Sequence, residues 1–265
     1  MQVTWGRRLH DVEADGFEAQ VKKVAGDGFR SIQLAPTKSL QFTQEMLSPG
    51  YARYIRRILD QNGLVVAVLG SYFDLSASEE EADLVIQRYK DHMQLAKWAG
   101  FSVVGTETGK IFPDDPDYEE RFQNVIRNLE PILEYAKTLG LSFAIEPVYG
   151  HTIYNAQKML EVLDHYPTEH LRVIYDPVNL LDPNDEEGAL EMWEDFIRKL
   201  GHLFVAVHVK DYDIENGKKV DRAAGFGRMA YTHLERLAKQ KPHLDFLIET
   251  AKDENIKQIR EQFKI

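Results

Sequence analysis

One pattern of hydrophobic and polar positions recurs along the chain. A stretch with apolar residues at helical spacing is followed by a glycine and then by a short apolar run. It occurs as VAGDGFRSIQL, LDQNGLVVAVL, AKWAGFSVVGTE, AKTLGLSFAIE and IRKLGHLFVAVHV. A glycine supplies the left-handed residue that ends a helix. The run after it is too short for a second helix and is rich in β-branched and aromatic residues, so the pattern predicts helices that alternate with strands.

Continuing the pattern over the whole chain predicts eight strand–helix units. The segments 82–96 and 122–136 place their apolar residues on one face of a helix, and the last helix is expected at 252–263. The candidate strands are 2–6, 30–34, 64–70, 101–107, 141–146, 170–176, 202–209 and 245–250. Strands that alternate with helices form parallel βαβ units. We therefore expect an α/β fold, a single (β/α)8 TIM barrel formed by one domain over residues 1–265.

An open, doubly wound sheet is the structural alternative to the barrel. That fold commonly binds a dinucleotide through a G-x-G-x-x-G turn after its first strand, and no such turn follows the first strand here. No linker or low-complexity segment divides the chain. Both observations favour the barrel.

Four polar residues end four successive apolar runs in the second half of the chain. They are Glu146 in FAIEP, Asp176 in VIYDP, His208 in VAVHVKD and Glu249 in FLIET. In a (β/α)8 barrel the C-terminal ends of the strands meet at one face, where active sites lie. Three carboxylates and one imidazole suit Mn²⁺, Mg²⁺, Co²⁺ or Zn²⁺, which indicates one divalent metal ion. The alternative is that these residues cap loops or pair with lysines, although a buried, unpaired carboxylate is costly.

Composition and charge narrow the range of partners. The net charge is −11 and the basic residues are scattered, which argues against a nucleic-acid partner. No apolar run is long enough to cross a membrane, so no membrane partner is expected. The chain contains no cysteine and begins without an apolar leader, so a cytoplasmic location is expected. A small-molecule substrate fits these properties best, and assembly into a homo-oligomer remains an open alternative.

The order and spacing of the motifs IEP, YDPVN, HVKD and IET resemble the xylose-isomerase-like barrels, the sugar phosphate isomerases/epimerases. That superfamily also contains ketose 3-epimerases, inosose dehydratases, hydroxypyruvate isomerases and apurinic endonucleases. The resemblance implies that Glu146, Asp176, His208 and Glu249 hold one metal ion. It also implies that Glu146 and Glu249 act as the catalytic acid/base pair of a sugar isomerase or epimerase. The expected substrate is a small polyhydroxy carbonyl compound derived from a sugar or polyol.

Two positions depart from the ketose 3-epimerase pattern and leave the reaction open. Asn179 stands where many of those enzymes carry a histidine, and Ile214 stands where they carry an arginine. Arg222 is the nearby arginine that could replace it. An inosose-type dehydratase using the same metal is the main alternative, followed by a non-catalytic sugar-binding barrel and an abasic-site endonuclease. Few histidines at strand ends argue against the endonuclease.

Further candidates lie next to the four strand-end residues. The expected substrate-binding residues are His151, Lys210, Glu107, Asn179 and Arg222. Lys210 follows His208 by two positions and is therefore expected on the same side of its strand. Arg7 and His10 follow the first strand as candidate rim contacts, whereas Trp5 and Tyr72 are either core or pocket-lining aromatics. Each charged residue has the alternative role of a solvated or ion-paired side chain.

Overall fold

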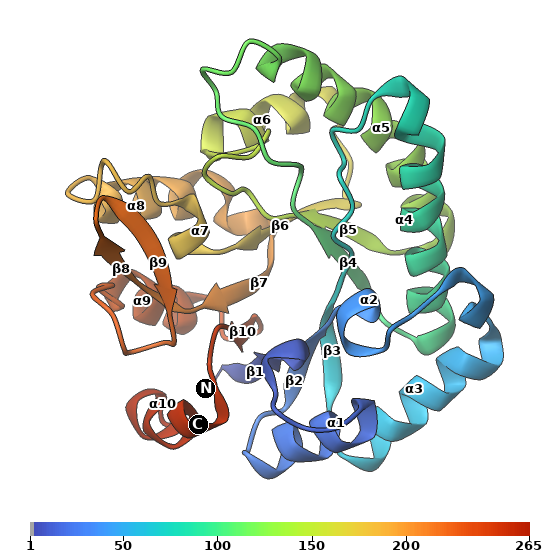
Figure 1. The fold of residues 1–265 in the computed structure, drawn as a ribbon, viewed down its shortest axis with the longest axis vertical. Coiled ribbons are helices and arrows are strands. Elements are labelled where there is room, and N and C mark those ends of the chain that lie inside the picture. The colour runs from blue at the N-terminus through green and yellow to red at the C-terminus, as the bar shows by residue number, and fades with distance from the viewer. Residues whose placement is uncertain (1–2) are drawn as a thin grey trace.

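The protein folds into a closed barrel of eight parallel strands in a computed structural model that describes residues 3–265. The strands follow one another around the barrel in the order β1-β10-β7-β6-β5-β4-β3-β2 (Figure 1). They are β1 (Thr4–Arg8), β2 (Ser31–Leu34), β3 (Val65–Gly70), β4 (Val103–Thr106), β5 (Ser142–Ile145), β6 (Leu171–Tyr175), β7 (Phe204–Val209) and β10 (Asp245–Ile248). The predicted (β/α)8 barrel is confirmed.

Helices surround the barrel on the outside (Figure 1). The longer ones are α1 (Phe17–Gly26), α3 (Pro49–Gln61), α4 (Glu79–Ala99), α5 (Tyr118–Leu139), α6 (Ala156–His165), α8 (Ala189–Leu200), α9 (Thr232–Gln240) and α10 (Ile256–Phe263). Two short helices, α2 (Pro36–Ser39) and α7 (Pro177–Leu180), follow strands β2 and β6 directly. None of these helices in residues 3–265 has the length and apolar character of a membrane span.

The element boundaries differ from the predicted ones mainly at the two ends of the chain. The first strand runs from Thr4 to Arg8 instead of 2–6, and Gln2 lies outside the described residues. The last helix starts at Ile256, after a 3-10 turn over Asp253–Asn255. The predicted helices 82–96 and 122–136 lie inside α4 and α5, which both end on a left-handed glycine, as the pattern indicated.

The barrel interior is filled by a small apolar cluster. Its buried members are Val68, Ala144, Ile174, Ala206 and Leu247, one from each of five strands. Strands β1 and β4 contribute glycines to the interior, where no side chain would fit. A Cβ at position 6 would lie 2.3 Å from the Ser31 hydroxyl, and one at position 105 would lie 2.5 Å from Ile174. Alternate residues of a strand share a face, so the residue two positions after each interior residue points to the C-terminal mouth of the barrel.

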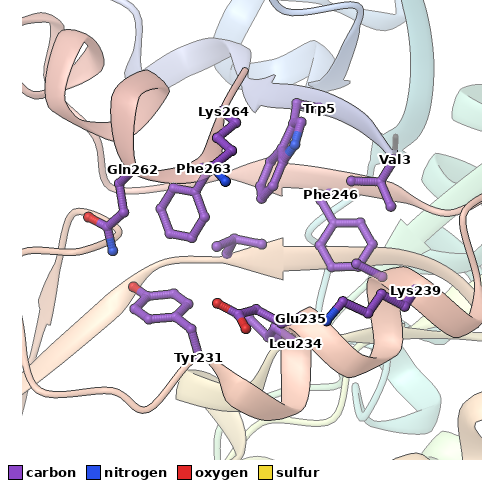
Figure 2. Close-up of a pocket in the computed structure, with 12 residues that line it drawn as sticks. Val3, Trp5, Tyr231, Leu234, Glu235, Lys239, Phe246, Gln262, Phe263 and Lys264 are labelled. Atoms are coloured by element: carbon purple, nitrogen blue, oxygen red, sulfur yellow. The ribbon is translucent and has the colours of Figure 1, made fainter. Parts of the chain in front are cut away.

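The opposite faces of β1, β7 and β10 pack against the outer helices. Trp5 contacts Phe246 and Phe263, with ring centroids 5.6 and 5.2 Å apart. These aromatic residues line a mostly apolar cavity of about 740 Å³ between α9 and α10 (Figure 2). None of the predicted site residues lines this cavity. Trp5 is therefore an aromatic residue of the outer wall.

A two-stranded antiparallel hairpin between β7 and α9 was not predicted. It consists of β8 (Asp211–Glu215) and β9 (Lys218–Arg222) and lies against α7 (Figure 1). Its turn residues Asn216 and Gly217 have φ angles of 52° and 72°. Positive φ at both central residues is the geometry that Asn-Gly favours in tight hairpins. The signal for this hairpin was therefore present in the sequence.

Candidate metal centre

The four strand-end residues converge at the mouth of the barrel. Glu146, Asp176, His208 and Glu249 each stand two positions after an interior residue, and all are at most 2 % exposed. Their shared centre is the Nδ1 atom of His208. It lies 3.2 Å from Glu146 Oε2, 3.3 Å from Glu249 Oε1 and 3.8 Å from Asp176 Oδ2. The arrangement follows from strand alternation, because each apolar interior residue places the polar residue after it on the same face.

The second oxygen of each of the three carboxylates forms hydrogen bonds with residues outside the group of four. Glu146 Oε1 accepts a hydrogen bond from Asn179 Nδ2 at 2.6 Å, and Asp176 Oδ1 accepts one from the Asn179 backbone N–H at 2.9 Å. Glu249 Oε2 accepts from Arg8 at 3.0 Å and from Lys210 at 3.4 Å. Glu146 and Glu249 are thereby each oriented through one oxygen while the other faces His208, whereas Asp176 Oδ2 lies 3.8 Å from His208 and 2.9 Å from Lys210 Nζ.

The charges of the centre shift the pKa values of its members. Burial alone would lower the pKa of His208, but the nearby carboxylates of Glu249 and Glu146 raise it to about 9. Burial alone would raise the pKa of Glu249, but His208, Arg8 and Lys210 lower it to about 2. Without a metal ion, His208 therefore carries a proton at neutral pH and partly neutralises the carboxylates around it.

The residues present fit a divalent metal ion. Glu146, Asp176 and His208 each offer one ligand atom, and these atoms lie within 4.8 Å of one another. The imidazole nitrogens make no well-aligned hydrogen bond to any of residues 3–265, although Nδ1 has three carboxylate oxygens around it. When the imidazole is neutral and Nδ1 carries no proton, the lone pair of Nδ1 faces the carboxylate oxygens. Because these groups repel one another, a cation between them would stabilise the arrangement. Glu249 stands outside the compact group of three, and its role as the fourth ligand stays a prediction.

Lys210 and Asn179 form a layer directly behind the carboxylates. Lys210 is 3 % exposed, and its Nζ lies 2.9 Å from Asp176 Oδ2 and 2.8 Å from Asn179 Oδ1. Asn179 therefore connects the lysine to Glu146. Lys210 also points to the same side of β7 as His208, as predicted. Because these side chains already bind protein groups, the structure gives them a role in orienting the centre, and their predicted contact with substrate remains a prediction.

Glu107 and His151 lie on the open side of the mouth. They line a cavity of about 200 Å³ together with Tyr72, Phe73, Asp74, Gly109 and Lys110. His151 Nε2 is 3.8 Å from Glu107 Oε2. Burial, followed by the negative charge of Glu146, raises the pKa of Glu107 to about 7. The cavity is smaller than the roughly 300–1,000 Å³ pockets of drug-sized ligands, so it suits a small metabolite. Tyr72 is thus a pocket-lining aromatic.

The arginines near the centre differ from the expected ones. Arg7 was expected at the rim, but it is fully buried on the outer wall, where it binds the Ala251 carbonyl at 2.8 Å and Asp253 at 2.9 Å. Its neighbour Arg8, which the sequence reasoning missed, reaches the centre instead. The signal was strand alternation, because Gly6 faces the interior and Arg8 is the next residue on that face.

His10 and Arg222 are placed by local contacts near the mouth. His10 is partly exposed, and burial followed by the charge of Arg8 lowers its pKa to about 4. Arg222 lies on β9, where it forms ion pairs with Glu215 and, at 3.8 Å, with Asp213. The residue of β9 that approaches the centre is Asp221, 3.5 Å from Lys210 Nζ. A substrate contact by Arg222 stays a prediction.

The comparisons with known proteins agree with this architecture. A crystal structure of a D-tagatose 3-epimerase-like protein superposes with a TM-score of 0.78 and 16 % identity, over 99 % of this chain and 97 % of that one. A structure of the IolI protein with a bound zinc atom has a TM-score of 0.77 and 14 % identity, over 99 % and 96 %. The probable 3-DHS dehydratase AsbF from Bacillus anthracis has a TM-score of 0.76 and 16 % identity, over 100 % and 98 %.

Similarity at these identities shows the fold alone. None of the curated proteins matches the sequence. The family model described as xylose isomerase-like TIM barrel, by contrast, matches residues 21–264, nearly the whole chain. The chain therefore belongs to the xylose isomerase-like TIM barrel family.

Proposed function

We propose that the protein is a metal-dependent sugar isomerase or epimerase that acts on a small polyhydroxy carbonyl compound by proton transfer next to the carbonyl. The observation that carries this proposal is the placement of Glu146 and Glu249. They come from β5 and β10, which lie on either side of β7 in the barrel order, and each turns one oxygen toward His208. Two carboxylates that approach one point from different sides suit a reaction that removes and returns a proton.

The side chains have separate roles in this proposal. Glu146, Asp176 and His208, with Glu249 as the fourth ligand, would hold a divalent metal ion. When bound, such an ion supplies a Lewis acid that polarises the substrate carbonyl and acidifies the adjacent C–H bond. Glu249 is ionised at neutral pH and is thus in the form that can accept the carbon-bound proton, although its lowered pKa makes it a weak base that depends on prior acidification of the C–H bond. Arg8 and Lys210 hold its second oxygen, which fixes the direction from which it approaches.

The fate of the proton distinguishes the two reactions. If Glu249 returns the proton to the former carbonyl carbon on the same side, and a proton passes from the adjacent hydroxyl to the former carbonyl oxygen, the carbonyl moves and the product is an isomer. If Glu146 takes up a proton from solvent and delivers it to the original carbon from the other side, while Glu249 releases its proton to solvent, that carbon is inverted and the product is an epimer. In both cases one proton leaves carbon and one proton is returned, so the composition of the substrate is conserved.

A dehydratase is the second candidate, and Glu107 is the observation that favours it. Expulsion of a hydroxyl group as water needs an acid that is still protonated near neutral pH. Burial and the charge of Glu146 raise the pKa of Glu107 to about 7, and this side chain lines the open cavity beside the centre. Glu249 would again remove the proton, and Glu107 would protonate the leaving hydroxyl.

Product analysis in deuterium oxide separates these functions. The metal-loaded protein is incubated with D-fructose, D-tagatose and scyllo-inosose, and the products are followed by NMR and mass spectrometry. An isomerase or epimerase incorporates deuterium next to the carbonyl and otherwise conserves mass, whereas a dehydratase releases one water. Absence of both exchange and water loss with all three compounds and with their phosphorylated and carboxylated counterparts, at full metal occupancy, would contradict the proposal.

Replacing the neighbouring residues Arg7 and Arg8 is expected to have different effects, one on stability and the other on activity. Arg8→Met removes the group that orients Glu249, and we expect kcat/KM to fall about 10- to 100-fold with little change in stability. Arg7→Met removes the buried partner of Asp253 and the Ala251 carbonyl on the outer wall. We expect it to lower the free energy of unfolding by about 2–3 kcal/mol, with activity of the folded protein retained.

Steady-state kinetics and urea unfolding, measured on both variants, test this pair. The exchanged result, in which Arg7→Met loses activity and Arg8→Met loses stability, would contradict the assignment of the two arginines to opposite faces of β1. Normal kinetics in Arg8→Met would show that Arg8 is not needed to hold the orientation of Glu249, which Lys210 also contacts.

A further inference from the structure

The β8–β9 hairpin brings one lysine to the mouth of the barrel. Lys219 is partly buried, and its Nζ donates a hydrogen bond of 2.6 Å to the Val178 carbonyl of α7. Val178 lies between Asp176 and Asn179, both of which belong to the centre or its supporting layer. Lys219 therefore reaches across the mouth from the hairpin to the segment that carries a proposed metal ligand.

Lys219 differs from Lys210 and Arg8 in forming no ion pair with any of residues 3–265. Lys210 pairs with Asp176, Glu249 and Asp221, and Arg8 pairs with Asp11 and Glu249. No carboxylate in residues 3–265 lies within ion-pair distance of Lys219, and only one of its three N–H donors has a partner. Burial and then the charge of Lys210 lower the pKa of Lys219, while the carboxylates of Asp176, Asp221 and Glu146 oppose them. A charge that is removed from water normally has a directly paired counterion, whereas these carboxylates act on Lys219 only from beyond ion-pair distance.

Two further lysines stand around the same opening. Lys110 lines the 200 Å³ cavity, and Lys38 places its Nζ 4.5 Å from the ring centre of Tyr72, which lines that cavity as well. Neither lysine forms an ion pair with any residue of the described range 3–265. Among the acids that line the cavity, Asp74 is already paired with Arg121 at 2.7 Å. Lys38, Lys110 and Lys219 therefore stand around the mouth without a directly paired carboxylate among residues 3–265, although the protein as a whole has a net charge of −11.

We propose that the substrate carries an anionic group, a carboxylate or a phosphate, and that Lys219 binds it. The inference rests on the proposed function for the reaction of this site and adds the class of substrate, a sugar acid or a sugar phosphate. The ammonium group has two free donors for the anion, and charge-assisted hydrogen bonds of this kind are about twice as strong as neutral ones. Lys219 is thus a specificity-determining residue on the hairpin, whereas the chemical step belongs to the strand-end residues.

Binding of unreactive sugar analogues tests this assignment. D-glucitol, D-gluconate and D-glucitol 6-phosphate have no carbonyl group and cannot undergo the proposed reaction. Their dissociation constants are measured by calorimetry on the metal-loaded wild type, on Lys219→Met and on Lys218→Met. The last is the matched control, because Lys218 is the adjacent, exposed lysine of the same strand. Metal content and circular dichroism establish that the variants are folded and loaded.

We expect the wild type and Lys218→Met to bind at least one anionic analogue about tenfold or more tightly than D-glucitol. The analogue that binds more tightly distinguishes a sugar phosphate from a sugar acid. In Lys219→Met the preference should fall to about threefold or less, with the affinity for D-glucitol unchanged. Equal binding of all three analogues by the wild type, or a preference that persists in Lys219→Met, would overturn the inference.

The proposed function can fail independently of this result. If the protein shows the anion preference but neither proton exchange nor water loss with any substrate, the reaction assignment is wrong and the anion site at Lys219 stands. If it catalyses proton exchange without any anion preference, the reaction assignment stands and Lys219 has no role in binding an anionic group.

Discussion

Replacement of Glu249 by glutamine is expected to lower kcat about 10³-fold while the barrel remains folded. The amide has nearly the shape of the carboxylate, so the space between Arg8, Lys210 and His208 stays filled. It cannot accept a carbon-bound proton, however, and a positioned general base contributes about 10²–10⁴-fold to such reactions. The measurement is kcat for substrate conversion together with solvent deuterium exchange.

Glu254→Gln is the matched control for this variant. Glu254 is an exposed glutamate five positions further along the chain, in the 3-10 turn before α10, and its replacement should leave kcat unchanged. Metal content gives a second readout, because loss of bound metal in Glu249→Gln would support its role as a ligand. Wild-type activity in Glu249→Gln would remove this residue from the mechanism and, with a metal-free wild type, would favour a non-catalytic sugar-binding barrel.

Removal of the metal ion is expected to abolish activity, and its return is expected to restore it. The binding should also depend on pH in a defined direction. In the metal-free protein the pKa of His208 is raised to about 9, so below that pH the imidazole holds a proton that a metal ion must displace. The apparent affinity should therefore rise about tenfold per pH unit as the pH increases from about 6 toward 9. Glu249 is already ionised throughout this range.

Calorimetric titration of metal-free protein with Mn²⁺ and Zn²⁺ tests this expectation. Buffers of different ionisation enthalpy report the number of protons released, and about one proton per metal ion is expected at pH 7. In His208→Gln that proton should disappear, and the affinity should be weaker and nearly independent of pH. An affinity of the wild type that does not change over this pH range would show that His208 is not a ligand.

The strand-end quartet could be located from the sequence because its signal is local. An apolar run marks a buried strand, and the first polar residue after it marks the point where the chain leaves the core. Glu146, Asp176, His208 and Glu249 therefore reveal their place without any knowledge of their neighbours. The short runs left the strand boundaries uncertain by one or two residues, and at β1 this shift hid the role of Arg8, which lies on the face shared with Gly6.

The repeated pattern of apolar runs, glycines and amphipathic segments by itself determined the (β/α)8 barrel and the four residues at its mouth. Each of these features depends on periodicity within a few consecutive residues. Only the tertiary structure decided that Arg7 supports the outer wall while Arg8 holds Glu249, that Asn179 connects Glu146 to Lys210, and that Lys219 reaches α7. These roles depend on contacts between segments far apart in the chain, and closure of the barrel and the folding of the hairpin onto its mouth create those contacts.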